Sequence, residues 1–206
     1  MQKLVFGLGT GRCGTHSLHK LLKEQDGADI SHEMGDFPFL PWEKSELRLK
    51  DYMWRITDTD SEFVGDIAFY CLPYVRDILK LHPDAKFIAL ERDRAETVES
   101  YMKKTEGRNH WQHHSEDTRS HLFRPCPWDI SYPKYHFFMT KKYAIGEYYD
   151  DYYSECRLLE EEFPNNVKLF KMEELNSRTG VASILHFAGI ENKNIKVGIK
   201  EKAREN

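Results

Sequence analysis

A short apolar run that leads into a glycine-rich turn restricts the fold of this chain more than any other feature. Residues 4–8 (LVFGL) contain no polar side chain, and residues 9–17 (GTGRCGTHS) follow directly. An apolar run without alternation is typical of a strand buried on both faces of a parallel sheet. Leu18, Leu21 and Leu22 then recur at the spacing of one helical face. This order of strand, tight turn and amphipathic helix predicts the first unit of a parallel α/β domain.

Further strand and helix patterns alternate along the rest of the chain. The predicted strands after the first cover residues 28–32, 63–67, 86–91 and 167–170, and the predicted helices cover residues 17–23, 43–56, 74–81, 95–104, 135–163 and 181–187. Strands that alternate with helices indicate a parallel sheet covered on both faces. We therefore expect one three-layer α/β/α domain over residues 1–206. Its central parallel sheet should have about five strands, as in P-loop nucleotide hydrolases.

Residues 105–133 interrupt this alternation with histidines, two tryptophans and three prolines. Long loops in compact domains are usually functional or disordered, so this segment is interpreted as an insertion or lid that recognises an acceptor. His110, His113 and His114 lie within it. No cysteine or carboxylate stands beside them at convincing ligand spacing, so we expect no metal site there.

Composition excludes several classes of protein. The formal net charge of −4 argues against a nucleic-acid binder that depends on overall basicity. The four cysteines form no C-x-x-C pair, which excludes a zinc ribbon and a thioredoxin motif. The apolar run at the start is too short for a signal-peptide core or a membrane span. We expect a cytoplasmic protein without a membrane span, whose oligomeric state the sequence leaves open.

The glycine-rich turn has the geometry of a phosphate site. Glycines allow close backbone approach, and the start of the following helix attracts anions. Gly9 and Gly14 have the spacing of the G-x-x-x-x-G-K-[ST] motif, but Thr15 and His16 replace its lysine and its magnesium-binding hydroxyl. The cation lies inside the turn, at Arg12. The turn therefore suits an anion with less charge than a triphosphate; a weak dinucleotide fingerprint and a plain connecting turn are the alternatives.

A second anion site is predicted where the strand at residues 86–91 ends. Arg92 stands at the carboxyl edge of the sheet, where parallel α/β proteins bind ligands, and an arginine there can hold a phosphate with two hydrogen bonds. Ser100 follows eight residues later, in the next predicted helix. The alternative is a surface salt bridge from Arg92 to Glu91 or Asp93, with no role for Ser100.

Together, the two sites resemble those of the sulfotransferase family. Residues 12–15 (RCGT) are similar to the family's loop that holds the 5′-phosphosulfate of 3′-phosphoadenosine-5′-phosphosulfate (PAPS). Residues 92–93 (RD) with Ser100 are similar to the motif that binds its 3′-phosphate, although Arg94 replaces the usual proline. Residues 170–175 (FKMEEL) resemble a late strand and the Glu-Asp-Leu segment that follows it in the family.

The resemblance implies a PAPS-dependent sulfotransferase that needs no metal. It would transfer a sulfuryl group to a hydroxyl or amine of a small-molecule or carbohydrate acceptor and release adenosine 3′,5′-bisphosphate. The implied cofactor-binding residues are Gly11, Arg12, Cys13, Gly14, Thr15, His16, Ser17, Arg92 and Ser100. Arg12 would also stabilise charge on the bridging and leaving oxygens.

The general base is less defined. Relatives often carry a catalytic carboxylate in the region where Glu33 follows the second predicted strand, so Glu33 ranks first. Asp66 ends the third predicted strand at the same sheet edge and ranks second, and His32 ranks third. Glu33 as a surface acid and Asp66 as a turn cap are the alternatives. For the whole chain, the alternatives are a P-loop-type kinase and a non-catalytic nucleotide-binding module.

Two further features are interpreted as packing. Tyr148, Tyr149, Tyr152 and Tyr153 are expected to pack in the core more than to form a stacking platform. Cys13 is expected to fill space within the turn, although a cysteine at a helix start can also be a nucleophile.

Overall fold

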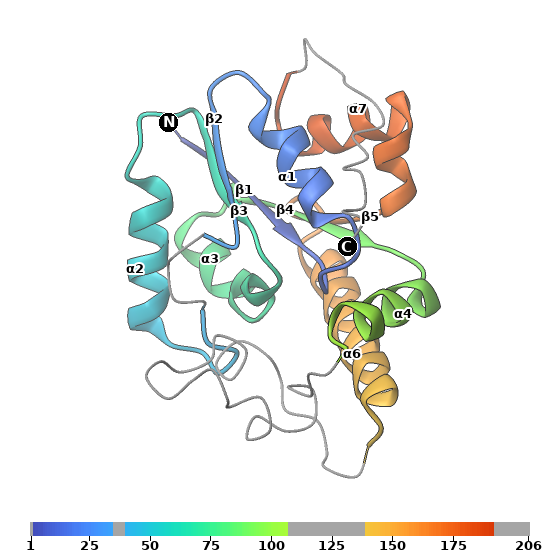
Figure 1. The fold of residues 1–206 in the computed structure, drawn as a ribbon. Helices are drawn as coiled ribbons and strands as arrows, with labels where there is room; N and C mark the ends of the chain where they lie inside the picture. Colours follow the sequence, from blue (N-terminus) through green and yellow to red (C-terminus); the bar gives the residue numbers. More distant parts are fainter. Residues whose placement is uncertain (1, 35–39, 107–138, 192–206) are drawn as a thin grey trace.

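A five-stranded parallel sheet lies at the centre of the computed structural model, which describes residues 2–34, 40–106 and 139–191 (Figure 1). The strand order is β2-β3-β1-β4-β5, and every neighbouring pair is parallel. The strands are β1 Lys3–Leu8, β2 Ala28–His32, β3 Phe63–Ile67, β4 Lys86–Glu91 and β5 Val167–Lys171. This arrangement confirms the predicted α/β fold with a P-loop-like sheet.

Helices connect the strands, as the sequence predicted. The α-helices are α1 Thr15–Lys23, α2 Glu46–Thr57, α3 Val75–Leu81, α4 Arg94–Lys104, α6 Lys141–Glu162 and α7 Arg178–Phe187, and the 3₁₀ helices are η1 Phe69–Tyr74 and η3 Met172–Asn176. Helix α2 begins three residues later than predicted, because Ser45 caps it by accepting from the Arg48 N–H at 3.4 Å. The two 3₁₀ helices were not predicted.

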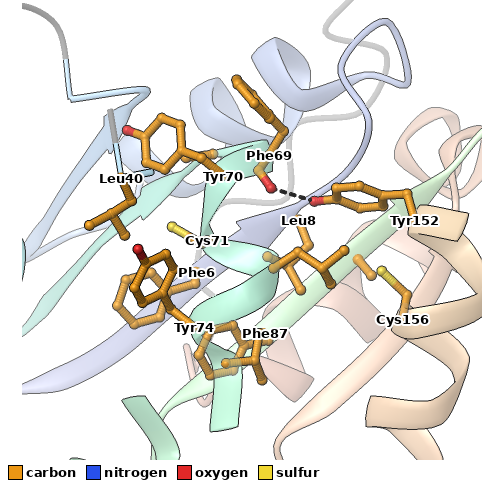
Figure 2. Close-up of a cluster of buried hydrophobic side chains, with 14 of the residues drawn as sticks. Phe6, Leu8, Leu40, Phe69, Tyr70, Cys71, Tyr74, Phe87, Tyr152 and Cys156 are labelled. Carbon is orange, nitrogen blue, oxygen red and sulfur yellow. Dashed lines mark hydrogen bonds between the residues drawn. The ribbon is translucent and has the colours of Figure 1, made fainter. Parts of the chain in front are cut away.

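Helices cover both faces of the sheet and produce two apolar cores. Leu18 of α1 and Ile184 of α7 pack with Val5 on one face. On the other face, Phe6 and Leu8 pack with side chains from α2, α3, α4 and α6. Figure 2 shows part of this second core, where Phe6 lies near Phe87 of β4, with ring centroids 5.0 Å apart. Burial of β1 on both faces explains why its sequence shows no polar alternation.

The strand register brings both predicted anion sites to one edge of the sheet. Leu8 at the end of β1 pairs with Ala89 of β4, so the glycine-rich turn and Arg92 follow neighbouring strands. On the other side of β1, His32 at the end of β2 pairs with Ile67 at the end of β3. The carboxyl edge of the sheet therefore collects residues that are far apart in the chain.

Most of the predicted insertion at 105–133, including His110, His113 and His114, lies outside the described residues. Its role as a lid or acceptor-recognition segment therefore stays a prediction, as does the single-domain organisation of residues 1–206. Within the described residues, no helix is both long and apolar enough to cross a membrane.

Candidate functional site

The glycine-rich turn after β1 has an unusual backbone. Gly11, Arg12 and Gly14 have φ values of 82°, 59° and 95°, in the left-handed region. This conformation is unfavourable for Arg12, which has a Cβ atom, so surrounding contacts must hold it. Gly14 precedes α1 and supplies no side-chain cap, and a Cβ there would lie 2.9 Å from Cγ of Met172. The turn thus directs the start of α1 and its N–H groups toward the sheet edge.

Hydrogen bonds join the two predicted anion sites. Arg12 Nε donates to Ser100 Oγ at 3.0 Å, and Arg92 Nη1 donates to the Arg12 carbonyl oxygen at 3.2 Å. Arg12 and Arg92 are 80 positions apart in the sequence. The structure therefore brings Arg12, Arg92 and Ser100 into one contact network.

Arg92 has a partner that the sequence analysis did not identify. Its Nε and Nη2 atoms lie 2.9 and 2.8 Å from Oε2 of Glu96, one turn along α4. The suggested salt bridges from Arg92 to Glu91 or Asp93 are wrong. Glu91 pairs instead with Lys171 of β5 at 2.5 Å and with Arg157 of α6. Asp93 caps α4 by accepting from the Glu96 N–H at 2.9 Å. The Arg92 side chain is only 26% exposed.

Tyrosine hydroxyls from α4 and α6 hold the backbone around the turn. Tyr101 and Tyr148 donate to the Thr10 carbonyl, Tyr149 to that of Arg92 and Tyr153 to that of Leu90, while Tyr152 accepts from the Gly9 N–H at 3.0 Å and donates to the Phe69 carbonyl at 3.1 Å. Figure 2 shows the bond from Tyr152 to Phe69. The predicted packing role is correct for the buried rings, but these backbone contacts were missed. The paired i, i+4 spacing on α6 was the available signal.

Replacing Tyr152 with phenylalanine should lower the free energy of unfolding by about 1–3 kcal/mol, because the buried Gly9 N–H loses its acceptor. Denaturant unfolding would measure this loss. The control is Tyr143→Phe on the same helix, where the residue is 53% exposed and the expected change is within about 0.5 kcal/mol. Equal effects in the two variants would contradict a role for the Tyr152 hydroxyl in holding the turn.

Three side chains of the turn are buried, those of Thr10, Cys13 and Thr15. Cys13 is fully inaccessible, and burial raises the pKa of its thiol. A protonated, inaccessible thiol is a poor nucleophile, so the packing interpretation of Cys13 suits the geometry. Thr15, the first residue of α1, is also buried.

Glu33 lies just past the end of β2, in a tight turn. Its φ is 53°, and that of Met34 is 36°, so two consecutive non-glycine residues are left-handed. The Glu33 N–H donates to the Ile67 carbonyl at 3.3 Å. Burial, and then the charge of nearby Asp66, raise the pKa of the Glu33 carboxyl to about 7. A carboxylate with this pKa is a stronger base than an ordinary surface glutamate.

Asp66 is fully buried and surrounded by donors. Its Oδ1 accepts from Ser31 Oγ at 2.8 Å and from the Met34 N–H at 3.3 Å, and its Oδ2 accepts from the hydroxyls of Tyr52 at 2.9 Å and Tyr70 at 2.8 Å. Burial raises the pKa of Asp66, and these hydrogen bonds oppose that effect. The hydroxyl of an acceptor substrate would have to displace one of these hydrogen-bond donors to reach the Asp66 carboxylate. The geometry therefore favours Glu33 over Asp66 as a base.

A histidine cluster links α1 to the end of β2. The His16 and His32 rings are stacked with centroids 4.1 Å apart, and His19 lies 5.6 Å from His32. The pKa of His32 is lowered to about 4, mainly by burial and to a smaller extent by the charges of His16 and His19. Among the described residues, no group forms a hydrogen bond with the buried His32 Nε2. A neutral imidazole with so low a pKa is a weaker base than Glu33 at neutral pH.

The described residues contain no group of three or more histidines, cysteines and carboxylates arranged to hold a metal ion. The donors at the sheet edge are instead guanidinium groups, hydroxyls and backbone N–H groups, which bind phosphate and sulfate oxygens.

Comparisons with known proteins identify the family of this chain. The family model of the sulfotransferase domain matches residues 4–173. A crystal structure of a sulfotransferase from Alicyclobacillus acidocaldarius is similar, with a TM-score of 0.57 and 20% identity over 93% of this chain and 82% of that chain. Mouse sulfotransferase SULT7A1 complexed with PAP has a TM-score of 0.51 and 12% identity over 94% of this chain and 59% of that chain. A comparison with curated proteins finds no match. Since the family model spans most of its length, the chain belongs to the sulfotransferase family.

Proposed function

We propose that this chain transfers a sulfuryl group from PAPS to a hydroxyl or amine of a small-molecule or carbohydrate acceptor. The observation that carries the proposal is the contact network in which Arg12 meets Ser100 and Arg92 meets the Arg12 carbonyl. A donor with phosphates at both its 3′ and 5′ positions needs two anion sites side by side. The mouse sulfotransferase whose structure is complexed with PAP, the nucleotide product of such a donor, supports the same cofactor.

The residues present suit such a donor. The left-handed turn at Gly11 and Gly14 and the start of α1 offer N–H groups to a 5′-phosphate. Arg92 and Ser100 offer donors to a 3′-phosphate, in exchange for their present contacts. When bound, PAPS supplies an activated sulfur whose bond to the 5′-phosphate oxygen breaks as the acceptor oxygen bonds to it.

The chain's own residues assist this displacement at three points. Arg12 balances the negative charge that collects on the bridging and leaving oxygens. The turn backbone holds the donor in line with the acceptor, which supplies the positioning that such displacements need. Glu33 takes the proton of the acceptor hydroxyl as the new S–O bond forms. The leaving nucleotide carries away the electron pair of the broken bond.

Calorimetry tests the cofactor. Adenosine 3′,5′-bisphosphate should bind without magnesium, whereas ADP and ATP with magnesium should bind much more weakly, because they lack the 3′-phosphate. Equal binding of magnesium–ATP would overturn the proposal in favour of a kinase. Tight binding without transfer from PAPS to any member of a panel of alcohols, phenols, sugars and amines would indicate a non-catalytic module.

The rate of transfer should depend on pH through Glu33. Glu33 must be deprotonated to accept a proton, and its pKa is raised to about 7. The rate should therefore be constant above pH 8 or so and fall about tenfold per unit well below pH 7. The measurement is kcat against pH with the best acceptor of the panel. In Glu33→Gln this acidic limb should disappear; an unchanged limb would remove Glu33 from its assigned role.

A further inference from the structure

We propose that Asp66 is a positioning residue for Glu33: its buried carboxylate fixes the turn that carries Glu33 and places a negative charge near the Glu33 carboxyl. The consequence for catalysis rests on the proposed function, in which Glu33 accepts the acceptor's proton. The structural relation between the two carboxylates can be tested without it.

Asp66 anchors the turn that carries Glu33. Glu33 and Met34 are both left-handed, which L residues with a Cβ adopt only when contacts impose it. Asp66 Oδ1 accepts from the Met34 N–H at 3.3 Å and from Ser31 Oγ at 2.8 Å, on either side of Glu33. Asp66 is also the register partner of Ser31 across β2 and β3. The Asp66 side chain therefore continues the pairing of the two strands into the turn.

Hydrogen bonding distinguishes the two carboxylates. Four donors surround the Asp66 carboxylate, two of them the hydroxyls of Tyr52 and Tyr70. Among the described residues, no hydrogen bond to the Glu33 carboxylate contributes to its pKa, which burial and the charge of Asp66 raise. Two nearby carboxylates resist being ionised together, and hydrogen bonds favour the charged form of the one that receives them. Burial also raises the pKa of Asp66, but its four hydrogen bonds oppose that effect. The proposal therefore places the negative charge on Asp66 and the proton bound near neutral pH on Glu33.

The other groups around the pair do not cancel this charge. Burial raises the pKa values of Tyr52, Tyr70 and Cys71, so all three are neutral at pH 7. Next to Glu33, burial lowers the pKa of His32 to about 4, so its ring is also neutral. His19 has its pKa lowered by burial as well, and its ring nitrogen Nε2 lies 3.0 Å from the Ile30 carbonyl oxygen. His16 stacks on the His32 ring.

The decisive measurement is the titration of the Glu33 side-chain carboxyl by carbon-13 NMR in the full chain. In the unmodified protein the midpoint should lie near pH 7. In Asp66→Asn, which keeps the shape of the side chain but removes its charge, the midpoint should fall by about one pH unit, since burial is the larger cause of the shift. It should stay above the value of a free glutamate, because the burial of Glu33 persists. The control Asp29→Asn, at the exposed start of β2, should leave the midpoint unchanged.

A purely structural role for Asp66 would lower stability without moving this midpoint, and an unmoved midpoint in folded Asp66→Asn would overturn the proposal. If Asp66→Asn does not fold, the titration of both carboxyl groups in the unmodified protein still tests the proposal. The proposal requires the Asp66 carboxyl to stay ionised while Glu33 titrates near pH 7. Titration of Asp66 near pH 7, with Glu33 titrating near its ordinary value, would contradict it.

The same variants separate this proposal from the proposed function. If Asp66→Asn moves the Glu33 midpoint while Glu33→Gln transfers sulfuryl groups at the normal rate, the coupling of the carboxylates stands and Glu33 is not the base. If Glu33→Gln abolishes the acidic limb but Asp66→Asn leaves the Glu33 midpoint unchanged, the function stands and the role of Asp66 fails.

Discussion

Replacing Arg92 with alanine should weaken the binding of adenosine 3′,5′-bisphosphate roughly a hundredfold and abolish the preference over ADP. Arg92 can offer two charge-assisted hydrogen bonds to a 3′-phosphate, each of about 1.5–3 kcal/mol, and about 1.4 kcal/mol corresponds to a tenfold change in Kd. Part of this gain is offset because Arg92 must first release Glu96, whose Oε2 lies 2.8 Å from its Nη2. Calorimetry with both nucleotides would measure the change.

Arg94 provides a matched control. It carries the same charge two residues away, but its guanidinium pairs with Asp150 of α6 at 2.7 Å, and its side chain is about half exposed. Arg94→Ala should therefore leave nucleotide affinity nearly unchanged, since surface ion pairs contribute little. If Arg94→Ala weakens binding as much as Arg92→Ala, the effect is one of net charge, and the assignment of a 3′-phosphate site to Arg92 fails.

Replacing Arg12 with alanine should lower kcat about 10²–10³-fold and weaken nucleotide binding much less. Removing one donor that stabilises developing charge has an effect of this size in other enzymes. The backbone N–H groups of the turn and the 3′-phosphate contacts of Arg92 remain to bind the nucleotide. The comparison is kcat for sulfuryl transfer from PAPS against Kd for adenosine 3′,5′-bisphosphate.

Arg12→Gly separates side-chain chemistry from backbone strain. Position 12 has a φ of 59°, where glycine is unstrained but alanine is not. The glycine variant should be about 1 kcal/mol more stable than the alanine variant, yet both should lose the same amount of turnover. Restored turnover in Arg12→Gly would mean that the defect of Arg12→Ala comes from the backbone. Unchanged turnover in both would remove Arg12 from the reaction.

Local patterns predicted the elements of the sheet well. The strands at 63–67 and 86–91 were predicted with the bounds that the structure has, because short apolar runs between turn residues identify buried strands. The bounds of the strand at 28–32 were also correct, although only Ile30 is buried in it. Helix ends were less accurate. The predicted helix at 43–56 begins at Glu46, and η1 was missed before α3. Both depend on local capping and on Pro73, which hydrophobic periodicity does not detect.

Only part of the candidate site could be predicted from the sequence. Spacing and residue type identified Arg12, Arg92 and Ser100, which the structure brings into contact. They gave no information about Glu96, because an acid on an exposed helical turn is common in any sequence. Sequence ranked Asp66 as a possible base, although its carboxylate is buried among four donors. Burial and hydrogen-bond saturation depend on residues from several elements, such as Ser31 and Tyr52.

The sequence by itself determined the parallel α/β fold and the presence of two cationic motifs, at Arg12 and at Arg92 with Ser100, that are typical of sulfotransferases. Both follow from hydrophobic periodicity and from residue spacing, which can be read within single segments of the sequence. Only the tertiary structure decided which hydroxyls hold the turn, that Arg92 contacts the turn through the Arg12 carbonyl, and which carboxylate is raised to a pKa of about 7. Those properties depend on distances, burial and charges among groups that come from different segments. The fold brings these groups together only where the strand ends meet at one sheet edge.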